Sequence, residues 1–172
     1  ACYLDSLTTL NYPAYGYCLL YEYRLFKQRI VDGVQVELPD IWMPEGDVWL
    51  VPRSDKACTV KFGGNLKQTW IDGKLDVTLE DYEEVLAVPY DMMISGGGSD
   101  AVNVLRLWKA QNPPNFNMKL FSQGQYVQAM QNSTNAEIIS KVLYPSDNHT
   151  EGKLLRLTQQ YFLVSASLQC II

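Results

Sequence analysis

The sequence predicts an α/β fold, in which a mixed sheet with β-hairpins packs against two long helices near the C-terminus. Three observations support this prediction. Asp-Gly pairs separate runs in which apolar and polar residues alternate, which is typical of β-hairpins. Other runs are apolar on both alternating faces, as in strands that protein covers on two sides. Near the C-terminus, leucines and aromatic residues recur at helical spacing.

The hairpin signal is strongest around the Asp32-Gly33 pair. Residues 34–38 read Val-Gln-Val-Glu-Leu, so one face of this segment is apolar and the other is polar. An Asp-Gly turn joins the segment to residues 27–31, as in a two-residue hairpin. Gly63-Gly64 predicts a second hairpin, and Asp72-Gly73 predicts a third turn.

Strands that are apolar on both faces are predicted at residues 15–21, 85–88 and 102–108. Pro89 cannot donate a ladder hydrogen bond, so the second of these strands is predicted to end there or to lie at a sheet edge. Residues 96–99 form a glycine run. A phosphate-binding loop should open a helix, but a strand-like segment follows this run, which favours a flexible loop.

Two helices are predicted after the strands. The second carries a continuous apolar stripe, made of Leu154, Leu157, Tyr161, Val164, Leu168 and Ile171. Its apolar surface is so broad that we expect protein to cover it, and without a helix-ending signal we expect a longer polypeptide. The first helix is predicted over Gln125–Tyr144. Its centre, residues 131–135, is polar on all sides, so the helix either breaks there or projects from the body.

Charge and composition exclude several classes of partner. The net charge is −5 and the isoelectric point is about 4.8, so the chain has no basic footprint for nucleic acid or an anionic membrane. No transmembrane run or signal peptide is found, and we expect a soluble, cytoplasmic protein. The four cysteines form no metal-binding or redox motif, and we expect small buried side chains in a reducing compartment. They are Cys2, Cys18, Cys58 and Cys170.

Few residues could carry chemistry by themselves. His149 is the only histidine, and its polar loop favours a surface or capping role over catalysis. The Asp147-Asn148 pair either caps or turns the chain before the following helix, or it points toward a ligand. The residues show no complete catalytic set and no metal site.

Long motifs nevertheless resemble one family in the same order from end to end. They include Cys-Tyr-Leu-Asp-Ser-Leu from Cys2, Tyr-Pro-Ala-Tyr-Gly-Tyr from Tyr12 and Phe-Lys-Gln-Arg-Ile-Val-Asp-Gly from Phe26. Further matches are Val-Asn-Val-Leu-Arg-Leu-Trp from Val102 and Leu-Tyr-Pro-Ser-Asp-Asn from Leu143. The sequence resembles the α-1,4-glucan phosphorylases, which comprise glycogen, starch and maltodextrin phosphorylases.

The resemblance implies a fold and an activity. It implies that residues 1–172 are part of the N-terminal Rossmann-like domain of a GT-B fold. Family members transfer a glucosyl unit from an α-1,4-glucan to inorganic phosphate. Their pyridoxal phosphate supplies its own phosphate group as a proton and charge partner to the substrate. The lysine that carries this cofactor belongs to the C-terminal half and is absent from this chain.

The resemblance also implies residue roles. Residues 145–153 are similar to the mobile gate of the family's active site, where the Asn148 amide would bind a glucosyl hydroxyl and Asp147 would help order the site. Residues 125–144 match the tower helix, which packs against the second subunit of a homodimer. Arg106 falls near the nucleotide effector site of regulated members.

Catalysis requires both substrates to be positioned between two halves, so we expect this chain alone to be inactive. Two other hypotheses remain. The chain is a non-catalytic module that binds oligosaccharide or self-associates, or it is a truncated piece without a role of its own. The preferred glucan length and any effector stay open.

Overall fold

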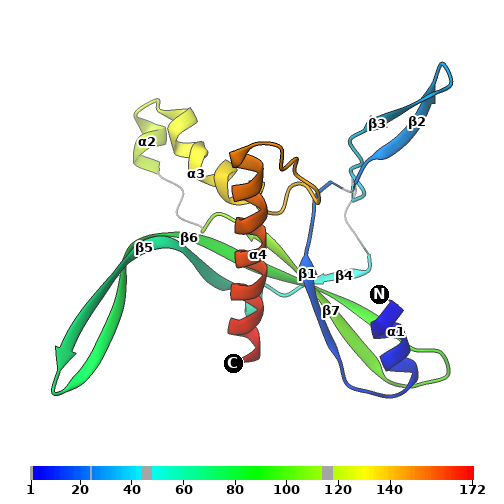
Figure 1. Cartoon of the computed structure of the whole chain (residues 1–172), viewed down its shortest axis with the longest axis horizontal. Helices are drawn as coiled ribbons and strands as arrows, with labels where there is room; N and C mark the ends of the chain where they lie inside the picture. Colours follow the sequence, from blue (N-terminus) through cyan, green and yellow to red (C-terminus); the bar gives the residue numbers. More distant parts are fainter. Residues whose placement is uncertain (1, 24, 44–47, 114–117) are drawn as a thin grey trace.

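The structure, a computed structural model, describes residues 2–23, 25–43, 48–113 and 118–172; for residues 129–134 it describes the backbone only. Its central strands, β6 (Lys74–Ser95) and β7 (Val102–Gln111), are antiparallel neighbours (Figure 1). On the other side of β7, β1 (Tyr15–Leu19) runs parallel to it. The prediction of an α/β fold with a mixed sheet is therefore confirmed.

Strand β6 continues through Pro89, so the prediction that this strand ends there or lies at an edge is wrong. Beyond Pro89 its partner changes from β5 (Cys58–Ile71) to β4 (Leu50–Pro52). The carbonyl of Pro89 accepts a hydrogen bond from the N–H of Arg53, at 2.9 Å, in the gap between these two partners. The missing proline N–H would point into the same gap, so no ladder hydrogen bond is lost.

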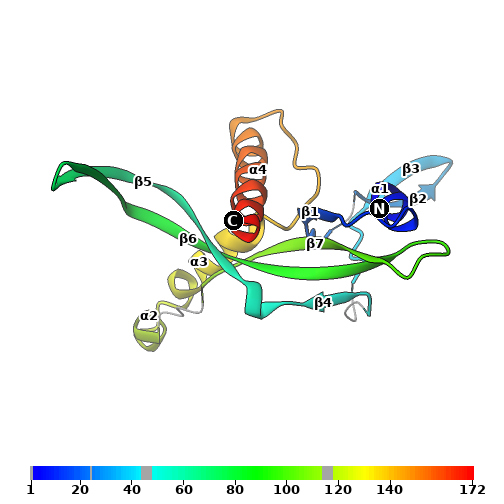
Figure 2. The same cartoon turned by 90° about the horizontal axis from the view of Figure 1, so that it is seen from below.

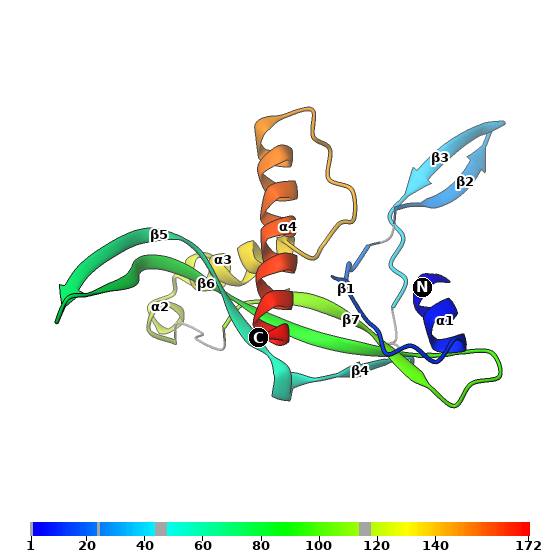
Figure 3. The same ribbon diagram turned by 60° about the horizontal axis from the view of Figure 1, so that its bottom comes forward.

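Two of the three predicted turns are confirmed. Asp32-Gly33 joins β2 (Lys27–Val31) to β3 (Val34–Leu38) with positive φ at both residues, as the two-residue hairpin requires. Asp72-Gly73 joins β5 to β6 in the same way. The two hairpins extend from opposite sides of the sheet (Figure 3).

The hairpin predicted at Gly63-Gly64 is wrong, because β5 runs through both glycines without reversing. Both have positive φ, and opposite them Asp81 also has a φ of 56°. A Cβ at Gly64 would lie 2.8 Å from the carbonyl oxygen of Glu80. The pair therefore makes an irregularity in the ladder, where glycine allows the two backbones to approach closely.

Helix α1 (Cys2–Thr9) packs against the ends of β6 and β7. The buried amide of Asn103 fixes its position by donating to the Thr8 hydroxyl and to the Tyr12 carbonyl, both at 2.9 Å. The glycine run forms the loop between β6 and β7, as the sequence favours, and the Gly97 N–H donates to the Thr9 hydroxyl. The loop thereby closes over the end of α1.

After the short helix α2 (Met118–Ser122), helix α3 spans Tyr126–Ile138, so the predicted helix over 125–144 is too long. It does not break at its polar centre. After Ile138 the backbone tightens into i→i−3 turns over residues 139–141, and Ser140 then bonds to other elements. The carbonyl of Ser140 accepts from the Glu22 N–H at 3.0 Å, and the Ser140 hydroxyl accepts from the Ala110 N–H at 3.2 Å.

Helix α4 (Thr150–Ile171) confirms the predicted C-terminal helix and stands on one face of the sheet (Figure 2). Its buried side consists of Gly152, Gln159, Phe162, Ala166 and Ser167. The apolar stripe that we expected to be covered is instead exposed in this chain, with Leu154 and Leu157 61% and 62% exposed. In the described part of the chain, no helix is long and apolar enough to cross a membrane.

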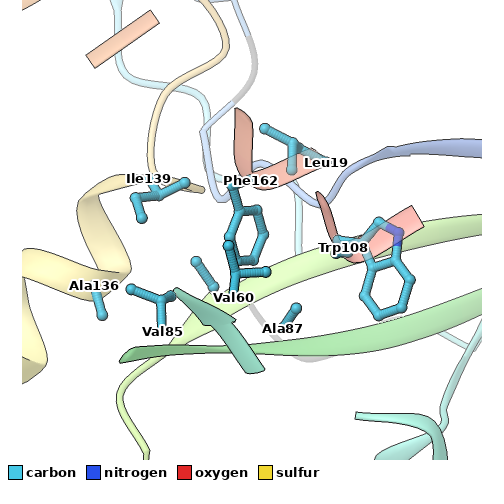
Figure 4. Packing of buried hydrophobic residues seen from close by; sticks show 10 residues of the cluster. Leu19, Val60, Val85, Ala87, Trp108, Ala136, Ile139 and Phe162 are labelled. Atoms are coloured by element: carbon cyan, nitrogen blue, oxygen red, sulfur yellow. The ribbon is translucent and has the colours of Figure 1, made fainter. Parts of the chain in front are cut away.

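The main core lies between α4, the end of α3 and the sheet (Figure 4). Trp108 and Phe162 are fully buried, and the indole N–H of Trp108 donates to the Ser167 hydroxyl at 3.2 Å. On the other face of the sheet, Leu20, Leu50 and Leu107 form a smaller cluster. The main core consists of Leu19, Val60, Val85, Ala87, Trp108, Ala110, Ala136, Ile139, Phe162 and Ala166.

We expect Gly96→Ala to destabilise the fold by roughly 1–3 kcal/mol, the usual range for overpacking. The new Cβ would lie 2.5 Å from the Thr9 backbone nitrogen, so α1 or the loop must move. Gly97→Ala is the matched control, because a Cβ there meets no atom within 4 Å. Urea unfolding of both variants tests this, and equal stability of the two would contradict it.

Candidate functional site

The predicted gate-like segment, residues 145–153, divides into a loop and the first turn of α4, which begins at Thr150. Gly152 lies directly under the loop, because a Cβ there would be 1.7 Å from the carbonyl oxygen of Ser146. Asp147 forms an ion pair with Arg156, with 2.9 Å between Oδ2 and Nη1. Two contacts therefore fix this loop to the helix that follows it.

His149 caps α4. Its Nδ1 accepts a hydrogen bond from the Gly152 N–H at 3.0 Å, and its backbone is extended, as at most N-caps. The capping interpretation of His149 is confirmed, whereas the cap considered for Asp147-Asn148 is wrong because His149 supplies it. Asn148 remains in the bend before the helix with its side chain exposed. Its amide is available to a ligand that reaches this loop.

Arg106, the predicted effector-site residue, lies on β7 in a buried ion pair. Its Nε and Nη2 donate to the two carboxylate oxygens of Asp91 at 2.7 and 2.8 Å. Arg106 is 4% exposed and Asp91 1% exposed, and the hydrogen bonds to Asp91 are the main reason that the pKa of Arg106 is raised. The remaining nitrogen, Nη1, donates to Cys170 Sγ at 2.8 Å.

Arg106 contributes to a cavity of about 620 Å³ between the sheet and the C-terminal end of α4. Two more positive charges lie in its wall. Arg53 follows the end of β4, and Lys56 belongs to the short 3₁₀ helix Ser54–Lys56. Arg53 also lies 3.6 Å from the Asp91 carboxylate. Hydrogen bonds from Arg53 lower the pKa of Asp55 to about 2, so this carboxylate stays ionised at neutral pH.

The structure does not bring all the predicted site residues together. Asp147 and Asn148 lie at the N-terminal end of α4, whereas Arg106 faces the C-terminal end. The sequence did not identify Arg53, Lys56 or Tyr15 as neighbours of Arg106. These residues come from separate strands and turns, so no local spacing pattern connects them.

A family model described as carbohydrate phosphorylase matches residues 1–172. The chain belongs to the carbohydrate phosphorylase family. It is 50% identical to a glycogen phosphorylase of Chlamydia pneumoniae and 45% identical to the liver form of glycogen phosphorylase of Homo sapiens. Both matches cover 100% of this chain, but 21% and 20% of these two proteins. The chain thus spans about a fifth of the length of its carbohydrate phosphorylase relatives.

We expect His149→Ala to lower stability by about 1 kcal/mol, because the Gly152 N–H loses its cap. His149→Asn is the matched variant, since asparagine is a good N-cap and should keep the stability near that of the wild type. Urea unfolding measures both changes. A loss of the same size in both variants would show that the cap is not what His149 contributes.

We expect Asp91→Asn to destabilise the protein by roughly 3–5 kcal/mol, because Arg106 would keep a buried charge without its counterion. Asp55→Asn is the control, because it removes a carboxylate from an exposed arginine pair, where little stability is at stake. Thermal unfolding compares the two variants. Similar melting temperatures would contradict the structural importance of the buried pair.

Proposed function

We propose that the chain is part of the N-terminal Rossmann-like domain of a GT-B glucan phosphorylase, which transfers glucosyl units from an α-1,4-glucan to inorganic phosphate. The observation that carries the proposal is the match of the carbohydrate phosphorylase family to the whole chain. Glycogen phosphorylases with 44–50% identity over the same residues support it. We place the full-length protein in the cytoplasm.

Asn148 is proposed to hydrogen-bond a glucosyl hydroxyl, and Asp147 to hold the loop in position for this contact. Two features support these roles. The Asn148 side chain is exposed in the bend before α4, so its amide can donate to a sugar. The ion pair between Asp147 and Arg156, together with the close contact at Gly152, restricts where the loop can lie. The loop therefore presents the amide at little conformational cost.

Pyridoxal phosphate is proposed for the full-length protein, where it would supply a phosphate group as a proton and charge partner to the substrate. The described residues do not fit its attachment, because none of the described lysines is buried and a Schiff-base lysine needs an enclosed site. We therefore assign no step through the cofactor to this chain. The residues that hold it belong to the part of the protein outside this sequence.

The exposed apolar stripe of α4 is proposed to pack against the remainder of the phosphorylase. A helix with buried side chains on one face and exposed leucines on another is usually embedded in protein. The relatives are about five times longer than this chain, so they contain material to cover the stripe. We also propose that the chain is inactive alone, because catalysis needs both substrates positioned between two halves and this chain supplies part of one half.

Segment 125–144 is proposed to pack against a second copy in a homodimer. The exposed apolar side chains at both ends of α3 support this role, because Tyr126 and Val127 are 57% and 83% exposed. Ile138 is exposed at the other end. An isolated helix with such a surface gains stability when a partner covers it.

The cavity at Arg106 is proposed as an effector site for an anionic ligand. Its wall carries Arg53, Lys56 and Arg106, while two carboxylates behind it are engaged, Asp91 by Arg106 and Asp55 by Arg53. Three positive charges therefore stand against two carboxylates here, and Lys56 carries the excess charge. Tyr15 and Tyr17 provide aromatic faces for a ring on the ligand.

The alternative, a non-catalytic module that binds oligosaccharide or self-associates, makes a different prediction. Assays of the full-length protein with glucan, phosphate and pyridoxal phosphate should yield glucose 1-phosphate if the phosphorylase proposal is right. Calorimetry that detects maltooligosaccharide binding without any turnover would favour the module. A chain that makes glucose 1-phosphate by itself would overturn its proposed inactivity.

We expect Asn148→Ala in the full-length protein to lower kcat/KM for phosphorolysis by roughly tenfold, the effect of one lost neutral hydrogen bond. Asn148→Asp should lose a similar amount, because it cannot donate from an amide. Asn65→Ala on the distant β5–β6 hairpin is the control. Wild-type rates for both Asn148 variants would exclude the proposed contact.

A further inference from the structure

Two cysteines that are far apart in the sequence face the same cavity wall. We expected all four cysteines to be small buried side chains, but Cys2, Cys18 and Cys170 are exposed and Cys58 is half-buried. Cys58 and Cys170 both line the cavity at Arg106. Strand β5 supplies the first residue and the end of α4 supplies the second.

Two contacts hold the segments that carry these cysteines side by side. Cys58 Sγ lies 4.0 Å from the carbonyl oxygen of Ala166, which accepts the helical hydrogen bond of the Cys170 N–H. On the neighbouring residues, Gln169 Nε2 donates to the Thr59 carbonyl at 3.1 Å. The last turn of α4 is therefore held against the first residues of β5, with Cys170 one helical turn beyond the atom that Cys58 touches.

The sulfur of Cys170 has the surroundings of a reactive thiol. Arg106 Nη1 donates to it at 2.8 Å, and the Tyr17 hydroxyl lies 3.9 Å away. The guanidinium cannot turn away easily, because its other nitrogens are fixed on buried Asp91. Cysteines that react with peroxides are typically exposed and lie beside such a cation.

Cys58 suits a second, slower role. Burial, and then its electrostatic interaction with Cys170, raise the pKa of the Cys58 thiol. Its sulfur lies 4.0 Å from the Ala166 carbonyl oxygen and lines the same cavity as Cys170, so it is placed to reach an oxidised Cys170 sulfur. Cys2 and Cys18, by contrast, do not line this cavity.

We propose that Cys170 and Cys58 form a peroxide-sensitive pair that closes to a disulfide between α4 and β5. The Cys170 sulfur attacks hydrogen peroxide, the O–O bond breaks, and a sulfenic acid and water form. The Cys58 sulfur then attacks the Cys170 sulfur, the S–O bond breaks, and the hydroxyl leaves as a second water with the Cys58 proton. Peroxide gains two electrons and the two thiols lose them.

The disulfide would change the cavity. It takes the Cys170 sulfur away from Arg106 and releases Nη1 toward the cavity interior. It also ties the last turn of α4 to β5, where a side-chain amide now makes the contact. Neither sulfur takes part in the proposed glucan chemistry, so this pair and that proposal can fail separately.

Peptide mapping of the full-length protein tests the proposal. The reduced protein is treated with hydrogen peroxide, alkylated, and digested with trypsin without reduction. We expect residues 57–61 to appear linked to the peptide that begins at Leu157, and this species should disappear on reduction. Cys18→Ser is the control and should leave the linked species unchanged.

Two further variants separate the steps. In Cys58→Ser, the linked peptide should be absent and dimedone should trap a sulfenic acid at Cys170. In Cys170→Ser, dimedone should label neither position. Absence of the 57–61 link in the wild type, or labelling of Cys58 rather than Cys170, would overturn the proposal. A mixed disulfide with Cys2 or Cys18 would overturn it equally.

Discussion

Helix α4 rests on the sheet through one narrow face, and most of the described tertiary structure depends on that contact. Phe162 and Ala166 have no exposed surface there. Gln159 lies on the same face, and its Nε2 donates to the carbonyls of Ile139 and Val142, both at 3.0 Å. These carbonyls belong to the turn after α3, so a buried amide from α4 satisfies backbone groups that the end of α3 would otherwise leave unpaired.

Both candidate sites follow from the position of this helix. Its first turn carries Gly152 and the His149 cap, which hold the loop with Asn148. Its last turn carries Gln169 and Cys170, which close one side of the cavity at Arg106. A movement of α4 along or about its axis would therefore alter both sites at once. The buried Asp91–Arg106 pair resists such a movement at the C-terminal end, because Arg106 also bonds to the helix.

Local signals in the sequence predicted the features that a few neighbouring residues determine. Asp32-Gly33 and Asp72-Gly73 make turns because both residues of each pair tolerate positive φ. The same reasoning failed at Gly63-Gly64, where the glycines serve a close backbone approach within a continuing ladder. It failed at Pro89, where the change from β5 to β4 removes the need for an N–H donor. In both places the partner strand decides the outcome.

The candidate sites were harder to predict than the strands, because they too depend on partners that are distant in the sequence. The sequence singled out Asp147, Asn148 and Arg106 through a resemblance, and the structure pairs Asp147 with Arg156 and Arg106 with Asp91. The neighbours of Arg106 come from the turn after β4, from β1 and from α4, and only the sheet order brings them together. Cysteine spacing likewise predicted no redox site, because spacing rules describe motifs within one turn or loop. Cys58 and Cys170 line one cavity because the last turns of α4 lie against β5, and Phe162 and Ala166 of the core set that packing.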